Sequence, residues 1–206
     1  MEDSLVPMRN YLAVATAAVL IGGAGTLLVA PASASPSAIS HFDGGSFETP
    51  TVAANTFQGL ATGQSVGAWR VTSGNVDLIG AGYWQAAEGD QSVDLNGTNA
   101  GAVSQTFTTV PGTTYMVTYS LAGNPEGSPN LKTGKVLVSG QNFQDFSFDT
   151  TGKTTTNMGY VRRQVTFVAT STSTTLTFTS TTPNSAWGPV IDDVTVKACP
   201  PPPCCG

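Results

Sequence analysis

The sequence predicts an all-β domain, built as an antiparallel sandwich or barrel, on three observations. Thr, Gly, Val and Ser dominate where a helical protein would use Leu, Ala, Glu and Lys. After residue 40, apolar and polar residues alternate with a period of two in several short runs. Pro, Gly and Asn separate these runs as turn residues do. About ten short strands in this arrangement are typical of a sandwich or barrel.

The N-terminal segment has the pattern of a secretory signal. Residues 11–30 are apolar and uncharged, and small residues ending at Ala34 follow them. We therefore predict a signal peptide over residues 1–34, cleaved after Ala34. A membrane-anchoring helix is the alternative, because about 20 apolar residues can span a bilayer. Translation from Met8 would give the signal a more usual basic start.

The strands follow in a single domain, predicted over residues 35–198. In residues 114–121, Tyr, Val, Tyr and Leu alternate with Thr, Met, Thr and Ser. Similar alternation recurs in residues 164–168 and 175–179. Each run predicts a half-buried strand with one apolar face and one hydroxyl-rich face. The chain is long enough to bury a core, since a domain of about 150 residues removes about 70% of its unfolded surface from water.

A short tail, residues 199–206, ends the chain with four prolines and three cysteines. The prolines favour an extended segment rather than a strand. Three cysteines cannot all pair within one exported chain, so Cys199, Cys204 or Cys205 could link two chains into a dimer. The alternative is a disordered end with one internal disulfide.

Composition and charge exclude several function classes. The formal net charge is −5 and there is no basic cluster, so a nucleic-acid partner is not expected. The sole histidine, His41, is the only histidine base available to a nucleophilic serine, so serine-nucleophile catalysis is not expected. A carboxylate pair for glycoside cleavage is conceivable among Glu88, Asp90 and Asp94. We expect the acids of this turn to be solvated and therefore predict that the protein is not an enzyme.

A carboxylate in the last predicted strand suggests a metal site. By strand alternation Asp192 shares a face with Val194 and Val196, where an unpaired charge would be costly. Calcium, held by carboxylates and backbone carbonyls, would compensate it. Glu48, after a glycine-rich turn, is the second candidate ligand. The alternative is that Asp192 caps a turn or pairs with an arginine.

Three aromatic residues lie beside glycines and are candidates for sugar contacts. Tyr83 and Trp84 follow Gly82, and Trp187 precedes Gly188. Aromatic faces stack on sugar rings, although such residues more often pack in a core. We predict that these three side chains are exposed and bind a glycan.

Longer motifs carry a resemblance to a known family. The motifs are GSFETP (45–50), AWRV (68–71), VDLIG (76–80), YWQAAEGDQSVDLNG (83–97), VSQTF (103–107), PGTTY (111–115), LAGNP (121–125), FSFDTTGKTTTNMGY (146–160), LTFTSTTP (176–183) and IDDVTV (191–196). Together they resemble the choice-of-anchor C proteins of bacteria. That family is similar to the plant cell-wall proteins of domain-of-unknown-function family 642.

The resemblance implies a galactose-binding-like jelly roll, as in carbohydrate-binding modules, that is secreted and non-catalytic. It also implies a structural calcium at the positions of Glu48 and Asp192. We therefore expect an extracellular, cell-wall-associated module that binds polysaccharide and, once its signal is cleaved, has no membrane partner. The alternative is a structural or adhesive envelope protein whose tail cysteines join subunits.

Overall fold

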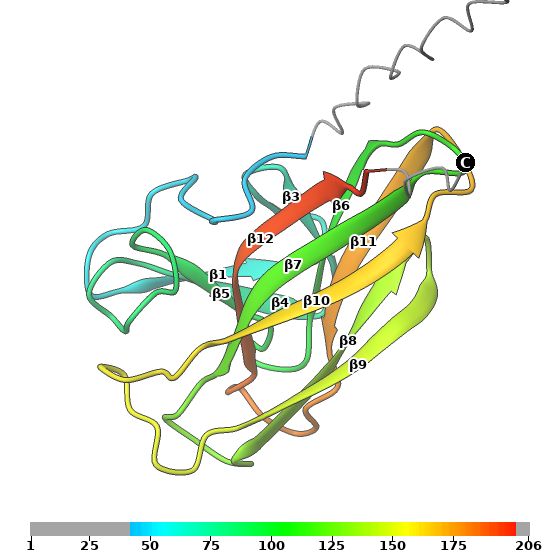
Figure 1. Ribbon diagram of the computed structural model, residues 1–206. Coiled ribbons are helices and arrows are strands. Elements are labelled where there is room, and N and C mark those ends of the chain that lie inside the picture. Colours follow the sequence, from blue (N-terminus) through cyan, green and yellow to red (C-terminus); the bar gives the residue numbers. More distant parts are fainter. Residues whose placement is uncertain (1–41, 201–206) are drawn as a thin grey trace, which may run out of the picture. The chain divides into compact units, whose positions relative to one another are not determined.

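The structure, a computed structural model, describes residues 42–200. In this range the chain forms twelve β-strands and no helix, which confirms the all-β prediction. The strands build two six-stranded antiparallel sheets packed as a β-sandwich (Figure 1). Sheet A has the order β1 (Phe57–Ala61), β4 (Asn75–Ile79), β5 (Ser92–Asp94), β12 (Pro189–Ala198), β7 (Thr114–Gly123) and β10 (Val161–Val168). Sheet B has the order β2 (Ser65–Val66), β3 (Trp69–Ser73), β6 (Ala102–Thr108), β11 (Ser173–Ser180), β8 (Leu131–Val138) and β9 (Gln141–Asp149).

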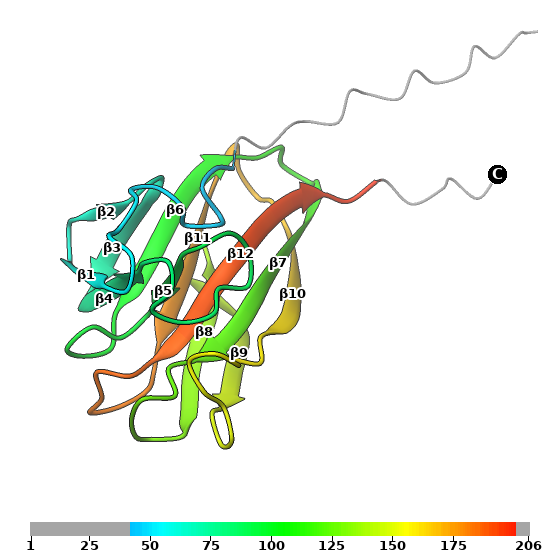
Figure 2. The same ribbon diagram turned by 90° about the vertical axis from the view of Figure 1, so that its left-hand side faces the viewer.

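The chain alternates between the two sheets through most of its length. β5 is followed by β6 in the opposite sheet, β6 by β7, and β7 by β8, and the last three connections also cross over (Figure 2). This connectivity makes the sandwich a jelly roll, in which most consecutive strands lie in opposite sheets. The jelly-roll expectation is therefore confirmed.

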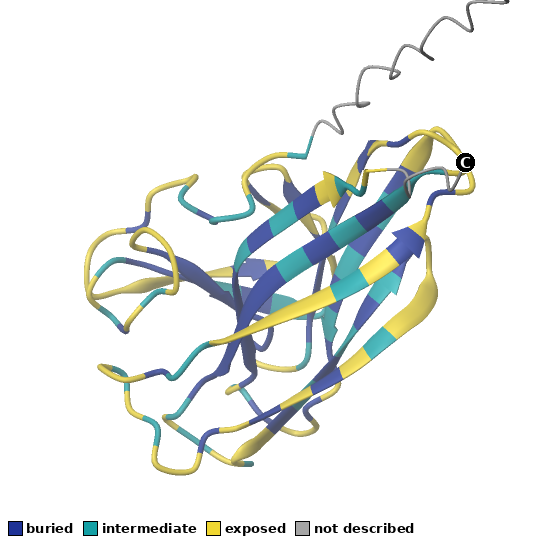
Figure 3. Ribbon diagram, in the orientation of Figure 1, coloured by how far each residue is buried: buried dark blue, intermediate teal, exposed yellow. Residues whose placement is uncertain are grey.

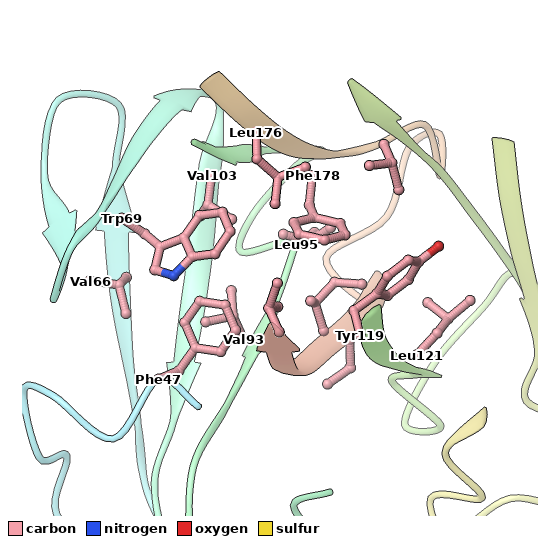
Figure 4. Close-up of a cluster of buried hydrophobic side chains, with 14 of the residues drawn as sticks. Phe47, Val66, Trp69, Val93, Leu95, Val103, Tyr119, Leu121, Leu176 and Phe178 are labelled. Atoms are coloured by element: carbon pink, nitrogen blue, oxygen red, sulfur yellow. The ribbon is translucent and has the colours of Figure 1, made fainter. Parts of the chain in front are cut away.

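Aliphatic and aromatic side chains together fill the core between the sheets (Figure 4). Trp69 is fully buried, and its ring lies 5.5 Å from Phe47 and 5.8 Å from Phe178, centroid to centroid. Its indole N–H donates to the carbonyl of Gly44 at 3.0 Å, which satisfies the one polar atom that the ring brings into the core. Tyr119 packs on Phe178 from sheet A at 4.9 Å and joins the two layers.

β7 shows the predicted alternation (Figure 3). Tyr115, Val117, Tyr119 and Leu121 are fully buried against the other sheet. Thr114, Met116 and Thr118, which face away from the other sheet, are only half-buried. Period-two patterning therefore identified the core face of this strand correctly.

β12 departs from regular alternation at Asp192. Ile191 pairs with the core residue Leu121 and Val196 with the core residue Val117, but the register shifts by one residue between Asp192 and Thr195. Asp193 has a positive φ of 49° at this bulge. The extra residue reverses the facing of the strand, so Asp192 lies opposite Ser120, on the outer face of sheet A. The prediction that Asp192 shares the face of Val194 and Val196 is wrong for this reason.

The two ends of the chain are only partly described. The predicted signal peptide, residues 1–34, lies outside the described residues, as do Cys204 and Cys205, so the signal stays a prediction. Cys199 is a free thiol, and its backbone N–H donates to the carbonyl of Thr114 at 2.8 Å. The described part of the tail thus gives no support to a disulfide-linked dimer. Between residues 42 and 200 no helix is long and apolar enough to cross a bilayer.

Candidate functional site

A cleft of about 340 Å³ opens on the outer face of sheet A. We name it the Asp77 cleft. β1 and β4 supply its floor, because residues that alternate with the buried Val76 and Leu78 point outward there. Its volume is at the small end of the range for ligand pockets, about 300–1,000 Å³. The lining residues are Phe57, Gly59, Asn75, Asp77, Ile79, Tyr83, Trp84, Gly97, Thr98, Asn124, Glu126, Ala186 and Trp187.

Four aromatic side chains line the cleft, and three of them are at least partly exposed. Trp187 is 39% exposed and Phe57 is 51% exposed, while Tyr83 is half-buried. Tyr83 contacts Phe57 edge to face, with ring centroids 5.7 Å apart, and its hydroxyl donates to Glu126 at 3.1 Å. The Trp187 indole lies directly on Gly127, where an added Cβ would fall 2.2 Å from the ring. Each ring is thus held by neighbours and still borders the open cleft.

Asp77 is the open acceptor of the site. No donor among the described residues hydrogen-bonds to its carboxylate. Burial raises its pKa to about 6. Gly97 keeps this group accessible, since an added Cβ would lie 3.0 Å from Oδ1 of Asp77, whereas one at Gly59 would lie 3.4 Å away, an ordinary contact distance. A carboxylate held without a partner at the edge of a cleft is ready to accept hydrogen bonds from a ligand.

Asp94 lies beneath the cleft and has a structural task. It is fully buried, and it accepts the backbone N–H groups of Asn96 at 2.8 Å and Gly188 at 3.0 Å. The side-chain amide of Asn124 donates to its second oxygen at 2.8 Å. Burial raises the pKa of Asp94 to about 8, despite these donors. Asp94 therefore holds the backbone of Gly188, next to Trp187, at the start of β12. It also holds the side-chain amide of Asn124 in the cleft wall.

The two amide side chains of the cleft are occupied within the protein. Asn75 donates to the hydroxyl of Thr98 at 2.7 Å and accepts the N–H groups of Thr98 and Asn99. Asn124 donates to Asp94 and accepts the N–H of Glu126 at 3.0 Å. The polar groups left for a ligand are the acceptor oxygens of Asp77 and Glu126 and two donors, the hydroxyl of Thr98 and the indole N–H of Trp187.

The structure brings all three predicted glycan-binding residues to one cleft, but only two of them are at least partly exposed there. Tyr83 and Trp187 are far apart in sequence and border the same cleft. Trp84 also contacts the cleft, but it is only 5% exposed and its indole N–H donates to Ser92 at 2.8 Å. The expected exposure of Trp84 is therefore wrong, because this ring packs into the domain.

Sequence reasoning missed Phe57 and Asp77. Phe57 lies on β1, an edge strand with mostly exposed residues, and nothing in its neighbourhood marks it as a binding residue. Asp77 sits in a run that reads as an ordinary strand. Its accessibility depends on Gly97, which is distant in sequence, so no local signal reveals it.

Glu48 and Asp192, the predicted calcium ligands, both bind one loop between β4 and β5. Glu48 accepts the N–H groups of Asp90 and Gln91, each at 2.9 Å, through Oε1. Asp192 accepts those of Ala87 at 2.7 Å and Glu88 at 3.0 Å through Oδ2. The ends of the domain thus meet at this loop, which we name the 87–91 loop.

The negative charges of Glu48 and Asp192 would favour a cation beside them, although backbone N–H groups already donate to most of their carboxylate oxygens. Burial raises the pKa of Asp192 to about 7, and the charges of Glu88 and Glu48 add to the effect. Oδ1 of Asp192 accepts the N–H of Asp193 at 2.6 Å, so Oε2 of Glu48 is the free oxygen of the pair. No group of three metal-binding side chains is gathered in residues 42–200. Backbone carbonyls would have to complete a calcium site.

Comparison with known proteins gives one family. The profile described as "Protein of unknown function (DUF642)" matches residues 40–197. Halomucin of Haloquadratum walsbyi is 34% identical over 139 residues, which is 66% of this chain. The chain spans only 1% of the length of halomucin.

Several solved structures are distantly similar to the sandwich. A family 35 carbohydrate-binding module from Clostridium thermocellum is 13% identical, with a TM-score of 0.47 over 68% of this chain and 97% of that chain. TmCBM61, solved with β-1,4-galactotriose, is 17% identical, with a TM-score of 0.46 over 80% and 100%. CBM35 from Paenibacillus barcinonensis is 18% identical, with a TM-score of 0.43 over 70% and 99%. These likenesses are too distant to identify a ligand.

Proposed function

This chain belongs to the DUF642 family, and we propose that it is a non-catalytic module that binds carbohydrate in the Asp77 cleft. One observation carries the proposal. The aromatic rings of Tyr83 and Trp187 border a cleft whose floor presents the unpartnered carboxylate of Asp77.

This combination matches the two surfaces of a sugar ring. The C–H groups of a pyranose form an apolar face that packs on aromatic rings, and its hydroxyls donate hydrogen bonds. A hydrogen bond to an ionised acceptor is roughly twice as strong as one between neutral groups. Trp187 and Tyr83 would supply the apolar contacts, and Asp77 would orient the ring through its hydroxyls.

The contacts of Asp94 and Glu126 support binding without cleavage. Glycoside hydrolysis requires two carboxyl groups on either side of the scissile bond, usually about 5–9.5 Å apart. Asp94 is sealed under the floor by three donors and is not a lining residue of the cleft. Glu126 is exposed on a loop at the cleft wall, where it accepts the hydroxyl of Tyr83.

The partner we propose is a polysaccharide of a cell wall or envelope. The predicted signal peptide supports export, and the weakly charged, Thr-rich surface suits an extracellular domain. Covalent assembly through the tail cysteines is not part of the proposal.

The test is retention of the purified domain on insoluble cellulose, chitin, galactan, pectin and bacterial cell wall. We expect at least one polymer to retain it and Trp187→Ala to abolish retention. Phe143→Ala is the matched control, because Phe143 is 41% exposed on β9 and does not line the cleft. No retention on any polymer, or equal loss in both variants, would overturn the proposal. Release of reducing sugar from a retained polymer would show an enzyme instead.

A further inference from the structure

We infer that the Asp77 cleft selects neutral, hydroxyl-rich glycans and rejects those that carry uronic acids. The inference rests on the proposed function and names the class of ligand. It follows from the charges, the hydrogen-bond polarity and the burial of the groups around the cleft.

The charges of the cleft have one sign. Asp77 and Glu126 line it, and Asp94 lies just beneath, paired across the strands with Asp77. No Lys, Arg or His is among the described residues that line the cleft. A ligand carboxylate would therefore enter a site that holds two lining carboxylates and no compensating cation. Like charges this close, in a partly desolvated cleft, repel more strongly than they do in water.

Lys132, the basic group that interacts with Asp94, cannot supply the missing charge. Lys132 is fully buried, and its ammonium donates to the carbonyl of Gly127 at 2.7 Å. Burial lowers its pKa, while the charge of Asp94 acts in the opposite direction. Lys132 is therefore committed to the interior beside Asp94 and does not line the cleft.

On the floor of the cleft, hydrogen-bond polarity supports the same selection. The amides of Asn75 and Asn124 donate to Thr98 and Asp94, and the hydroxyl of Tyr83 donates to Glu126. The open group on the floor, Asp77, can only accept when it is ionised. Sugar hydroxyls can donate hydrogen bonds to this carboxylate. An ionised uronate has no proton to donate at its carboxylate and would face acceptors there.

The test compares each neutral polymer with its own oxidised form. Cellulose, galactan and chitin are used before and after oxidation of part of their primary hydroxyls to carboxylates. The polymer that retains the protein most strongly is carried forward. At low salt and pH 8, we expect the oxidised form to bind at least about tenfold more weakly, equivalent to about 1.4 kcal/mol. The difference should shrink in high salt, because ions screen exposed charges.

Charge-neutral variants identify the source of the discrimination. Glu126→Gln keeps an acceptor for Tyr83 and should narrow the ratio between neutral and oxidised polymer by about threefold or more. Asp77→Asn should narrow this ratio further and should also weaken binding of the neutral polymer. Asp145→Asn, on β9 and outside the cleft, removes one charge and should leave the ratio unchanged.

The outcomes separate the two ideas. Equal or stronger binding of the oxidised polymer, or retention on pectin alone, would overturn the selectivity and leave carbohydrate binding intact. An unchanged ratio in both cleft variants would also overturn it. Failure of every polymer to bind would remove the proposed function itself.

Discussion

Asp77 on β4 and Asp94 on β5 lie directly opposite each other as a cross-strand pair. Like charges at such positions destabilise a sheet. Asp94 receives three hydrogen bonds, whereas Asp77 receives none from the described residues. A local arrangement that opposes folding is expected where function requires it. The pair is therefore consistent with the proposed role of the cleft floor in binding.

The pair predicts a stability that declines as the pH rises. Burial raises the pKa of Asp77 to about 6 and that of Asp94 to about 8. Both pKa values exceed the value of about 4 that these groups have in the unfolded chain. From about pH 4 to about pH 8 the folded state therefore binds more protons than the unfolded state, and the free energy of unfolding falls as the pH rises. We expect maximal stability at about pH 4–5 and a steady decline to about pH 8. Urea unfolding at several pH values measures this.

Asp94→Asn isolates the contribution of the buried acid. The variant loses an acceptor and is less stable at pH 5, but its stability should fall less between about pH 6 and 8 than that of the wild type. Asp145→Asn, an exposed acid near Lys135, should keep the wild-type slope. Parallel slopes in all three proteins would contradict the raised pKa of Asp94.

Trp84 and Trp187 should respond oppositely to truncation. Trp84 is buried and hydrogen-bonded, so Trp84→Ala should lower the free energy of unfolding by about 3–5 kcal/mol. Trp187 is partly exposed, so Trp187→Ala should lose glycan retention with a much smaller loss of stability. Thermal unfolding and polymer retention, measured on the same samples, distinguish the two effects. If both changes lower the free energy of unfolding to a similar extent, Trp187 serves in packing and not in glycan binding.

Two glycines offer a graded test of access to Asp77. An added Cβ at Gly97 would lie 3.0 Å from Oδ1 of Asp77, tighter than ordinary contact, whereas at Gly59 it would lie 3.4 Å away. We expect Gly97→Ala to weaken glycan binding about tenfold or more and Gly59→Ala to change it little. Binding isotherms on the retained polymer give the comparison. Equal binding by both variants would show that Asp77 does not contact the ligand.

Local patterning predicted the sandwich but not the site. The alternation that buries Tyr115 and Val117 is written in the sequence, as is the turn chemistry between strands. The bulge at Asp193 is not, because one extra residue in a strand leaves no local signature and reverses the facing of Asp192. The cleft joins residues from β1, β4 and four loops, so its composition depends on the sheet order.

Aromatic residues beside glycine were a partial guide. A neighbouring glycine correctly predicted that Trp187 is exposed and that Tyr83 lies in the cleft. It wrongly predicted that Trp84 is exposed. The sequence could not separate adjacent rings, because Tyr83 and Trp84 share every local feature. Only the packing of Trp84 toward Ser92 sends one ring inward.

The last prediction concerns calcium at the 87–91 loop. Glu48 and Asp192 hold this loop from opposite ends of the domain, and the raised pKa of Asp192, about 7, shows a carboxylate whose charge is poorly compensated. A cation near it would favour the ionised form, so calcium should stabilise the protein more at pH 8 than at pH 5. At tenfold excess over Kd the gain is about 1.4 kcal/mol, with Kd expected at about 10⁻⁴–10⁻³ M. That corresponds to a rise in melting temperature of about 3–6 °C.

Two aspartate variants decide the assignment of this calcium response. Asp192→Asn should abolish the rise in melting temperature, because it removes the buried charge that attracts the ion. Asp193→Asn, which breaks only the ion pair with Arg162, should keep most of it. A chelator should reverse the shift in the wild type and in Asp193→Asn alike. If neither calcium nor chelator moves the melting temperature at pH 8, the backbone N–H groups of the 87–91 loop satisfy both carboxylates, and Asp192 closes the domain without an ion.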